Sequence, residues 1–133
     1  NNLPFLVLNA DVLTNLDFSN MLDFHNQSRK IATLGISEYE YTIPYGVINI
    51  EDNFVQEILE KPKEKYFVNA GIYIVNPNVL DYLDTFSNNF DMPQLISQII
   101  GAGEKVGVFP IHEYWLDVGR MQDYNKAKTT FEK

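Results

Sequence analysis

The chain contains no cysteine, and this absence removes several kinds of chemistry at once. Disulfide frameworks, thiol nucleophiles and cysteine-ligated zinc sites all need this residue. Histidine is almost as scarce, since His25 and His112 are the only two. No G-x-S-x-G motif accompanies them, so the sequence gives little support to a serine hydrolase. His25 falls on the apolar face of an expected helix, which favours a packed histidine over a ligand.

The sequence also lacks long apolar runs and extended basic clusters. No apolar stretch reaches the ~18 residues that a transmembrane helix needs, and nothing resembles a signal peptide. The net charge is −8, so binding to nucleic acid or to an anionic membrane is not expected. The cytoplasm is therefore the expected compartment.

What the chain does contain is sufficient apolar surface for a packed core. Of its 133 residues 45% are hydrophobic, and these include nine Phe, eight Tyr and one Trp. Such a composition is typical of a globular protein rather than a disordered one. The length is that of one domain, or of a piece of one.

Strand patterns alternate with helix patterns along most of the chain, which predicts a mixed α/β layer. The expected strands cover residues 5–8, 31–36, 67–75 and 106–110, with a hairpin over 47–60. Helices are expected to begin at Asp17 or Ser19, at Asn76 and at Asp91, and a last one to run from Met121 to Phe131. Residues 38–42 and 63–65 are expected to be connectors.

The stretch from Phe5 to Asp11, read as FLVLNAD, organises the rest. Its four consecutive apolar residues suit a strand covered on both faces, as in a parallel sheet. Ligands of open α/β sheets bind beyond the carboxyl ends of the strands, where Asp11 is expected. Asp117 follows another short apolar segment and provides a second acid.

A pair of carboxylates at strand ends is a suitable ligand set for Mg²⁺. This ion takes one or two protein carboxylates together with substrate phosphates and water. The residue pattern leaves an equal alternative open, in which Asp11 caps a turn and Asp117 caps the last helix.

Three further groups of residues can contact a small ligand. Glu60 offers an acceptor for sugar hydroxyls and Lys61 a cation for phosphate, although exposed charges are the commoner reading. Tyr45-Gly46 and Asn69-Ala70-Gly71 can bring backbone groups close to a ligand, although each alone is more often a turn. Trp115 is expected in the core or a pocket wall, with a partner for its indole N–H.

Taken together, six stretches in this order resemble the sugar-1-phosphate nucleotidyltransferases. They are FLVLNAD at 5–11, YGV at 45–47, EKP at 60–62, VNAGIY at 68–73, DM at 91–92 and WLDVG at 115–119. The likeness extends from Phe5 to Phe131 and is greatest to bacterial enzymes of the mannose-1-phosphate guanylyltransferase type. It implies a Rossmann-like fold with a mixed, mostly parallel sheet flanked by helices.

The resemblance also implies a role for each matching residue. Asp11 and Asp117 would hold Mg²⁺ between a hexose 1-phosphate and the α-phosphate of a nucleoside triphosphate. Lys61 would contact the sugar phosphate. The remaining residues would contact the sugar or line its pocket: Gly46, Glu60, Asn69, Gly71 and Trp115. The products would be a nucleotide sugar and pyrophosphate.

Family members begin with a glycine-rich nucleotide loop, and this sequence contains neither G-x-x-x-x-G-K-[ST] nor G-x-G-x-x-G. The resemblance therefore implies that residues 1–133 are the C-terminal, sugar-phosphate-binding part of the domain, truncated at the N-terminus. We expect this piece to be inactive alone. We also expect it to self-associate or to pair with the missing segment, because strand edges and apolar faces would be uncovered.

Two other functions remain open from the sequence. The main alternative is a noncatalytic regulatory or sugar-phosphate-sensing domain on the same fold. The presence of both Asp11 and Asp117 favours catalysis, because a sensor does not need two metal ligands. A metal-dependent glycosyltransferase is less favoured, because such enzymes commonly use Asp-x-Asp and Asn9-Ala10-Asp11 carries one acid.

Overall fold

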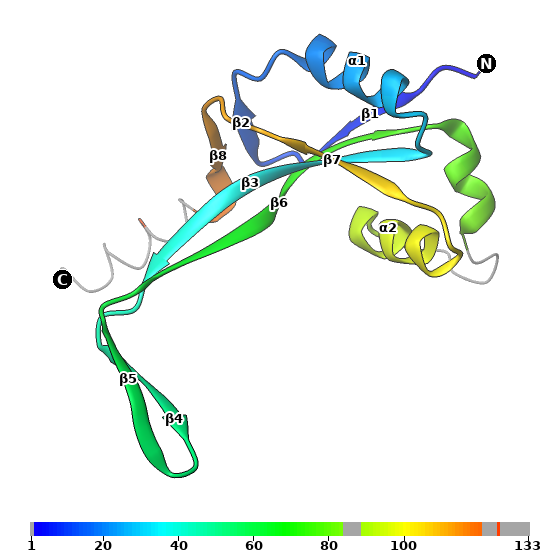
Figure 1. Cartoon of the computed structure of the whole chain (residues 1–133). Helices are drawn as coiled ribbons and strands as arrows, with labels where there is room; N and C mark the ends of the chain where they lie inside the picture. Colours follow the sequence, from blue (N-terminus) through cyan, green and yellow to red (C-terminus); the bar gives the residue numbers. More distant parts are fainter. Residues whose placement is uncertain (1, 84–88, 121–124, 126–133) are drawn as a thin grey trace. The chain divides into compact units, whose positions relative to one another are not determined.

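The computed structural model describes residues 2–83, 89–120 and 125, arranged as strands and helices (Figure 1). The chain divides into two compact units, one of residues 1–37 and 69–133 and one of residues 38–68. Its elements in chain order are β1 (Phe5–Leu8), β2 (Val12–Thr14), α1 (Phe18–Ser28), β3 (Ala32–Thr42), β4 (Gly46–Glu51), β5 (Phe54–Glu60), β6 (Lys63–Val75), the 3₁₀ helix η1 (Pro77–Tyr82), α2 (Met92–Gly101), β7 (Val106–Pro110) and β8 (Trp115–Asp117). None of the described helices is long and apolar enough to cross a membrane.

A four-stranded sheet in the order β1-β6-β3-β7 forms the centre of the first unit. Strands β3 and β7 are parallel, whereas β1 and β6 are antiparallel. The predicted mixed α/β sheet is therefore confirmed, with β6 running against the other three strands. Strand β6 follows β3 after a hairpin, and a strand that returns after a hairpin reverses direction.

Both faces of β6 are covered over residues 70–75, and the side chains there alternate between two hydrophobic clusters. Tyr73 and Val75 pack in one cluster with Leu95, Ile96 and Ile99 of α2. The intervening Ile72 and Ile74 belong to the other cluster, together with Met21 of α1. This period-two alternation places α1 and α2 on opposite faces of the sheet (Figure 1).

Helix α1 begins as the sequence predicts, with Asp17 as its N-cap. The Asp17 carboxylate accepts a hydrogen bond from the Ser19 backbone N–H at 3.0 Å. His25 is 2% exposed, and its ring nitrogens lie 2.8 Å from Thr33 Oγ1 and 2.8 Å from Asn76 Oδ1. The expectation of a packed histidine is therefore confirmed.

Helix α2 also begins at its predicted cap. Asp91 and Gln94 form a reciprocal capping box, in which each side chain accepts a hydrogen bond from the other residue's backbone N–H, at 2.9 and 3.0 Å. Pro93 lies in the first turn, where a missing N–H costs little. The expected helix from Met121 to Phe131 falls outside the described residues apart from position 125.

Strand β1 differs from its prediction, because it is not covered on both faces. It lies at the end of the strand order, and Phe5 and Leu8 are 49% and 46% exposed. A four-residue apolar run carries no alternation, so it cannot distinguish a central strand from an edge strand. The exposed apolar surface expected of this part of the chain is observed, since Phe5 and Leu6 line an apolar groove against Leu22 of α1.

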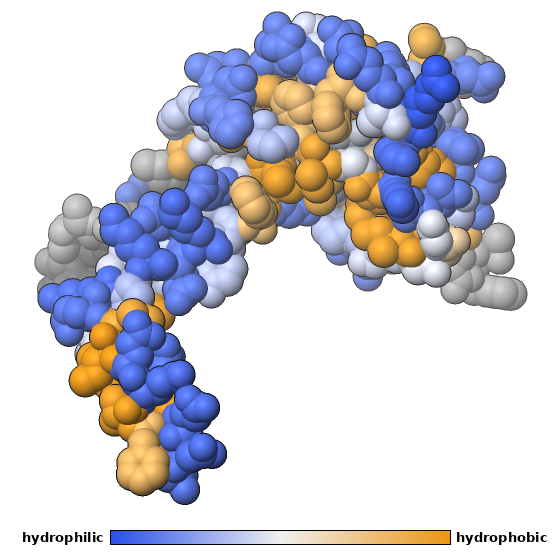
Figure 2. Space-filling view, in the orientation of Figure 1, coloured by the Kyte–Doolittle hydropathy of each residue, from blue (hydrophilic) through white to orange (hydrophobic). Residues whose placement is uncertain are grey.

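The second unit contains the predicted hairpin, formed by β4 and β5. Its two turn residues, Asp52 and Asn53, have φ of 51° and 69°, as a two-residue turn of type I′ requires. Many of its apolar side chains are exposed, and they gather along one side of the hairpin in the view of Figure 2. The most exposed of them are Ile50, Phe54, Val55 and Ile58.

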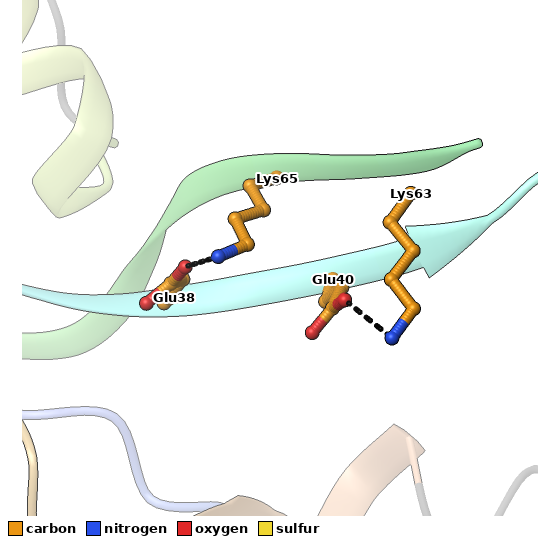
Figure 3. Close-up of polar contacts among 4 residues, drawn as sticks. All are labelled: Glu38, Glu40, Lys63 and Lys65. Atoms are coloured by element: carbon orange, nitrogen blue, oxygen red, sulfur yellow. Dashed lines mark ion pairs between the residues drawn. The ribbon is translucent and has the colours of Figure 1, made fainter.

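The two segments predicted to be connectors are strands instead. Residues 38–42 continue β3, and residues 63–65 begin β6. Lys63 lies 3.6 Å from Glu40, and Lys65 lies 3.6 Å from Glu38, so alternate charges of one strand meet those of the other (Figure 3). The polar and aromatic composition of residues 38–42 and the charge run at 63–65 indicated connectors, but exposed strands accommodate such residues by cross-strand pairing.

Candidate functional site

The two acids predicted to bind a metal lie next to each other in the first unit. Asp11 stands in the turn between β1 and β2, and Asp117 is the last residue of β8. Antiparallel pairing of β2 with β8 places Val12 opposite Asp117. The Val118 N–H also donates to the Asp11 carbonyl oxygen at 2.8 Å. The backbone therefore connects the two acids directly.

Gly119 provides the space into which both carboxylates project. A Cβ at this position would lie 2.9 Å from Asp11 Oδ2 and 3.4 Å from Asp117 Oδ1. The glycine also forms part of a depression of about 360 Å³ that is lined by Ala10, Asp11, Val12, Leu13, Val118 and Gly119. Asp117 Oδ1 accepts a hydrogen bond from the Arg120 backbone N–H at 3.3 Å, at the start of the helical residues 118–120. The alternative role of Asp117 as a helix cap is therefore observed, and the same bond helps to hold the carboxylate beside Asp11.

This donor set is compatible with Mg²⁺. Two carboxylates supply oxygen ligands around a space that a single Cβ would fill. Among the described residues, no cluster of three or more potential metal-ligating side chains occurs. A site with two protein ligands leaves coordination positions for phosphate oxygens and water, which is the usual arrangement for Mg²⁺. Asp11 and Asp117 could therefore hold this ion together with a phosphorylated substrate.

Asn69 and Gly71 lie on β6 and are held by internal hydrogen bonds. Asn69 Oδ1 accepts from the Gly71 N–H at 2.8 Å, and Asn69 Nδ2 donates to the Tyr73 hydroxyl at 2.8 Å. Gly71 has φ of +72°, and a Cβ there would lie 2.5 Å from Asn9 Nδ2. Glycine is therefore required at 71 by both the backbone conformation and the contact with Asn9.

The Asn69 amide is oriented without being saturated. An amide oxygen accepts two hydrogen bonds and its nitrogen donates two, so each end has capacity for one more partner. The internal bonds fix the side chain in one orientation, which suits a residue that contacts a ligand.

Trp115 has the hydrogen-bond partner that its sequence environment predicted. Its indole N–H donates to the Ala70 carbonyl oxygen at 2.8 Å. The ring is half-buried and packs against the cluster on the α1 face of the sheet. Trp115 is thus attached to β6 next to Asn69 and Gly71.

The other three predicted residues lie together in the second unit. Gly46 and Glu60 are register partners in the hairpin, and a Cβ at Gly46 would lie 3.4 Å from Glu60 Oε2. The Lys61 N–H donates to the Tyr45 carbonyl oxygen at 3.2 Å, and Lys61 has φ of 43°. A left-handed backbone at a non-glycine residue is uncommon and is often found where a side chain must be held in a special direction.

The eight predicted residues therefore fall into two groups. Asp11, Asp117, Asn69, Gly71 and Trp115 belong to the first unit, while Gly46, Glu60 and Lys61 belong to the second. Each group is internally connected by pairing or hydrogen bonds.

Two residues that contact the first group were not assigned a role from the sequence. Asn9 packs on Gly71, and Gly119 faces both carboxylates. Both lie inside stretches that the sequence marked, FLVLNAD and WLDVG. The signal for Gly119 that the sequence analysis did not use is a glycine two residues beyond a strand-end acid, because glycine leaves room beside a carboxylate.

The fold is that of an α/β protein, and Asp11 and Asp117 lie at the ends of strands, where open α/β sheets generally bind their ligands. The family model described as nucleotidyl transferase matches residues 1–133. The chain therefore belongs to the nucleotidyl transferase family.

Two of the matching relatives are similar to this chain over most of its length. A mannose-1-phosphate guanyltransferase from Yarrowia lipolytica is 34% identical over 128 residues, a match that covers 91% of this chain and 34% of the relative. The mannose-1-phosphate guanylyltransferase catalytic subunit beta of Drosophila melanogaster is 30% identical, with 91% and 33% covered. The chain spans about a third of the length of these curated relatives.

A solved structure confirms the fold. A Bacillus anthracis protein assigned as a glucose-1-phosphate thymidylyltransferase, crystallised with sucrose, superimposes with a TM-score of 0.59. The sequences are 18% identical, and the match covers 89% of this chain and 50% of the other.

Proposed function

We propose that the protein transfers a nucleotidyl group from a nucleoside triphosphate to a hexose 1-phosphate, giving a nucleotide sugar and pyrophosphate. The observation that carries this proposal is the convergence of the Asp11 and Asp117 carboxylates beside Gly119. In a member of the nucleotidyl transferase family, two such carboxylates are suited to holding a metal between two phosphate groups.

The reaction is an in-line substitution at the α-phosphorus. An oxygen of the sugar phosphate forms the new P–O bond, and the bond from the α-phosphorus to the β-phosphate bridging oxygen breaks. Bound Mg²⁺ would neutralise negative charge on the two phosphate groups that approach each other. Asp11 and Asp117 would fix the position of that charge, so catalysis is mainly positioning and electrostatic stabilisation.

Binding of the sugar phosphate is assigned to the remaining residues. Glu60 would accept hydrogen bonds from sugar hydroxyls, and Lys61 would contact the phosphate. Asn69 has hydrogen-bonding capacity left for the sugar. Gly46 and Gly71 would allow a close approach of the ligand to the backbone, and Trp115 would form part of the pocket wall.

The names of the relatives favour one substrate pair for the first test. Both curated relatives described above are named as mannose-1-phosphate guanylyl- or guanyltransferases. Mannose 1-phosphate and GTP are therefore the proposed pair, because the identity to these relatives reaches 34%.

The test is pyrophosphate release by the complete protein that carries this sequence. It should be measured with Mg²⁺ across the four nucleoside triphosphates and a panel of hexose 1-phosphates. Turnover with one pair would establish the reaction and identify both substrates. A folded protein that turns over no pair but binds a hexose 1-phosphate would contradict the proposal and favour the sugar-phosphate sensor.

A further inference from the structure

The segments that carry the two acids are both bonded to one short part of β6. The Asn9 N–H donates to the Gly71 carbonyl oxygen at 2.9 Å. The Trp115 indole N–H donates to the Ala70 carbonyl oxygen at 2.8 Å. Each donor residue precedes an acid by two positions, Asn9 before Asp11 and Trp115 before Asp117. Two adjacent carbonyl groups thus hold the two segments, one through a backbone N–H and the other through a side-chain N–H.

We propose that residues 69–71 act as a tether that sets the separation of the Asp11 and Asp117 carboxylates, with Asn9 and Trp115 as positioning residues. This inference rests on the proposed metal site. In this proposal the hydrogen bond of Trp115 to Ala70 positions Asp117, in addition to any contact of the ring with the sugar.

The tether is itself rigid. Ala70 is fully buried, and Tyr73 is 1% exposed. Asn69 joins the two ends of the segment, because it accepts from the Gly71 N–H and donates to the buried Tyr73 hydroxyl. Asn69 itself is exposed, whereas Ala70 and Gly71, which provide the two carbonyl anchors, are buried. Closely packed and internally bonded residues of this kind can transmit a displacement at one anchor to the other.

Gly71 makes the Asn9 anchor possible. A Cβ at this glycine would lie 2.5 Å from Asn9 Nδ2 and 2.9 Å from Asn9 Cγ. Asn9 therefore packs directly on the β6 backbone, and its distance from Gly71 leaves no tolerance for a larger residue. A side chain at 71 would displace the Asn9 amide and would also be strained by the φ of +72° at this position.

A simpler explanation is that the pairing of β2 with β8 alone fixes the acids. Val12 lies opposite Asp117, and the Val118 N–H donates to the Asp11 carbonyl oxygen. Under that explanation the indole bond contributes to folding stability but not to the metal site. The two explanations predict different effects of removing the indole N–H from a protein that still folds.

The experiment is a Mn²⁺ titration of the 133-residue chain, followed by the electron paramagnetic resonance signal of the free ion. Trp115→Phe keeps an aromatic ring but removes the hydrogen-bond donor. The tether predicts that this variant weakens Mn²⁺ binding by about tenfold or more, as changes to groups that orient metal ligands do. Gly71→Ala is expected to weaken it to a similar extent.

Phe109→Leu is the matched control, because Phe109 packs against the same hydrophobic cluster without bonding to Ala70. It should lower the melting temperature while leaving Mn²⁺ affinity unchanged. Equal affinities for Trp115→Phe, Phe109→Leu and the unaltered chain, with binding lost in Asp117→Asn, would overturn the tether and leave the metal site intact. Failure of the unaltered chain to bind Mn²⁺ saturably would overturn both.

A second measurement needs no variant. Trp115 is the only tryptophan, so its indole N–H gives a single signal in a nitrogen-correlated NMR spectrum. The tether predicts slow hydrogen exchange of this N–H and its selective broadening by Mn²⁺. Exchange as fast as in an exposed tryptophan would overturn the proposal even if Trp115→Phe fails to fold.

Discussion

Gly119 is the residue at which the geometry of the candidate metal site is most sensitive. Asp11 Oδ2 and Asp117 Oδ1 lie 2.9 and 3.4 Å from the position of an added Cβ. Both distances are at or below ordinary van der Waals contact, so even a methyl group would force a carboxylate to move.

Gly119→Ala is therefore predicted to weaken Mn²⁺ binding by about tenfold or more, since orientation of the ligands is disturbed. Gly101→Ala is the matched control, because a Cβ at this last residue of α2 would have no neighbour within 4 Å. The control should bind Mn²⁺ with unchanged affinity. Isothermal titration calorimetry of both variants makes the comparison, and equal affinities would remove Gly119 from the site.

At the scale of single elements, α1 is expected to depend on pH through its N-cap. Hydrogen bonds from the Ser19 hydroxyl and backbone N–H lower the pKa of the Asp17 carboxyl below its ordinary value. A folded-state pKa below the unfolded one gives stability that is present above the unfolded value and lost as the pH falls through the folded value. The loss should therefore begin as the pH falls below about 4.

Asp17→Asn tests this prediction, because asparagine is an equally good N-cap but does not titrate. Thermal unfolding followed by circular dichroism should show a smaller decrease in melting temperature between pH 5 and pH 3 for the variant. Identical decreases in both proteins would show that Asp17 does not contribute to the acid sensitivity.

The attachment of α1 to the sheet is expected to depend on His25. Its ring bridges the buried Thr33 hydroxyl and Asn76, at 2.8 Å on each side. His25→Leu fills the space but leaves both partners unsatisfied, so the free energy of unfolding should fall by about 2–4 kcal/mol. Urea denaturation measures this free energy of unfolding. His112→Leu, at an exposed histidine, should change it by less than about 0.5 kcal/mol.

The elements that the sequence predicted best are those with local signals. The caps Asp17 and Asp91 and the hairpin over 47–60 each depend on neighbouring residues, and all three are confirmed. Two predictions were wrong. Strand β1 was expected to be covered on both faces, and the start of β6 was expected to be a connector. Their environment is decided by pairing with distant residues, such as Lys63 with Glu40, which local composition does not reveal.

At the scale of the whole molecule, exposed apolar side chains are the main feature without an assigned partner. Phe5 and Leu6 are exposed on edge strand β1, and Ile50 and Phe54 are 70% and 75% exposed in the hairpin. Exposed apolar surface in each of the two units favours association.

We predict that the 133-residue chain forms concentration-dependent oligomers in sedimentation velocity experiments. Replacing both Ile50 and Phe54 with threonine should decrease the oligomeric fraction, because threonine keeps the strand preference while reducing apolar area. A chain that sediments as a monomer at all concentrations would contradict the prediction.

The candidate site could be predicted in part from the sequence. Asp11 and Asp117 are far apart in the chain, and only their position after short apolar segments indicated that they meet. The anchors Asn9–Gly71 and Trp115–Ala70 could not be predicted, because a hydrogen bond to a backbone carbonyl leaves no signature in residue type. The roles of Gly46, Glu60 and Lys61, and inactivity of the 133-residue chain alone, stay predictions.

The most direct test of the central claim compares Asp117→Asn with the unaltered complete protein in a Mg²⁺ titration of pyrophosphate release. Loss of one metal-binding carboxylate should lower kcat/KM by about a thousandfold, since a bound metal contributes several kcal/mol to such reactions. Asp23→Asn, at an exposed position on α1, is the control and should retain full activity. Full activity with unchanged Mg²⁺ dependence in Asp117→Asn would contradict the assignment of this carboxylate as a metal ligand.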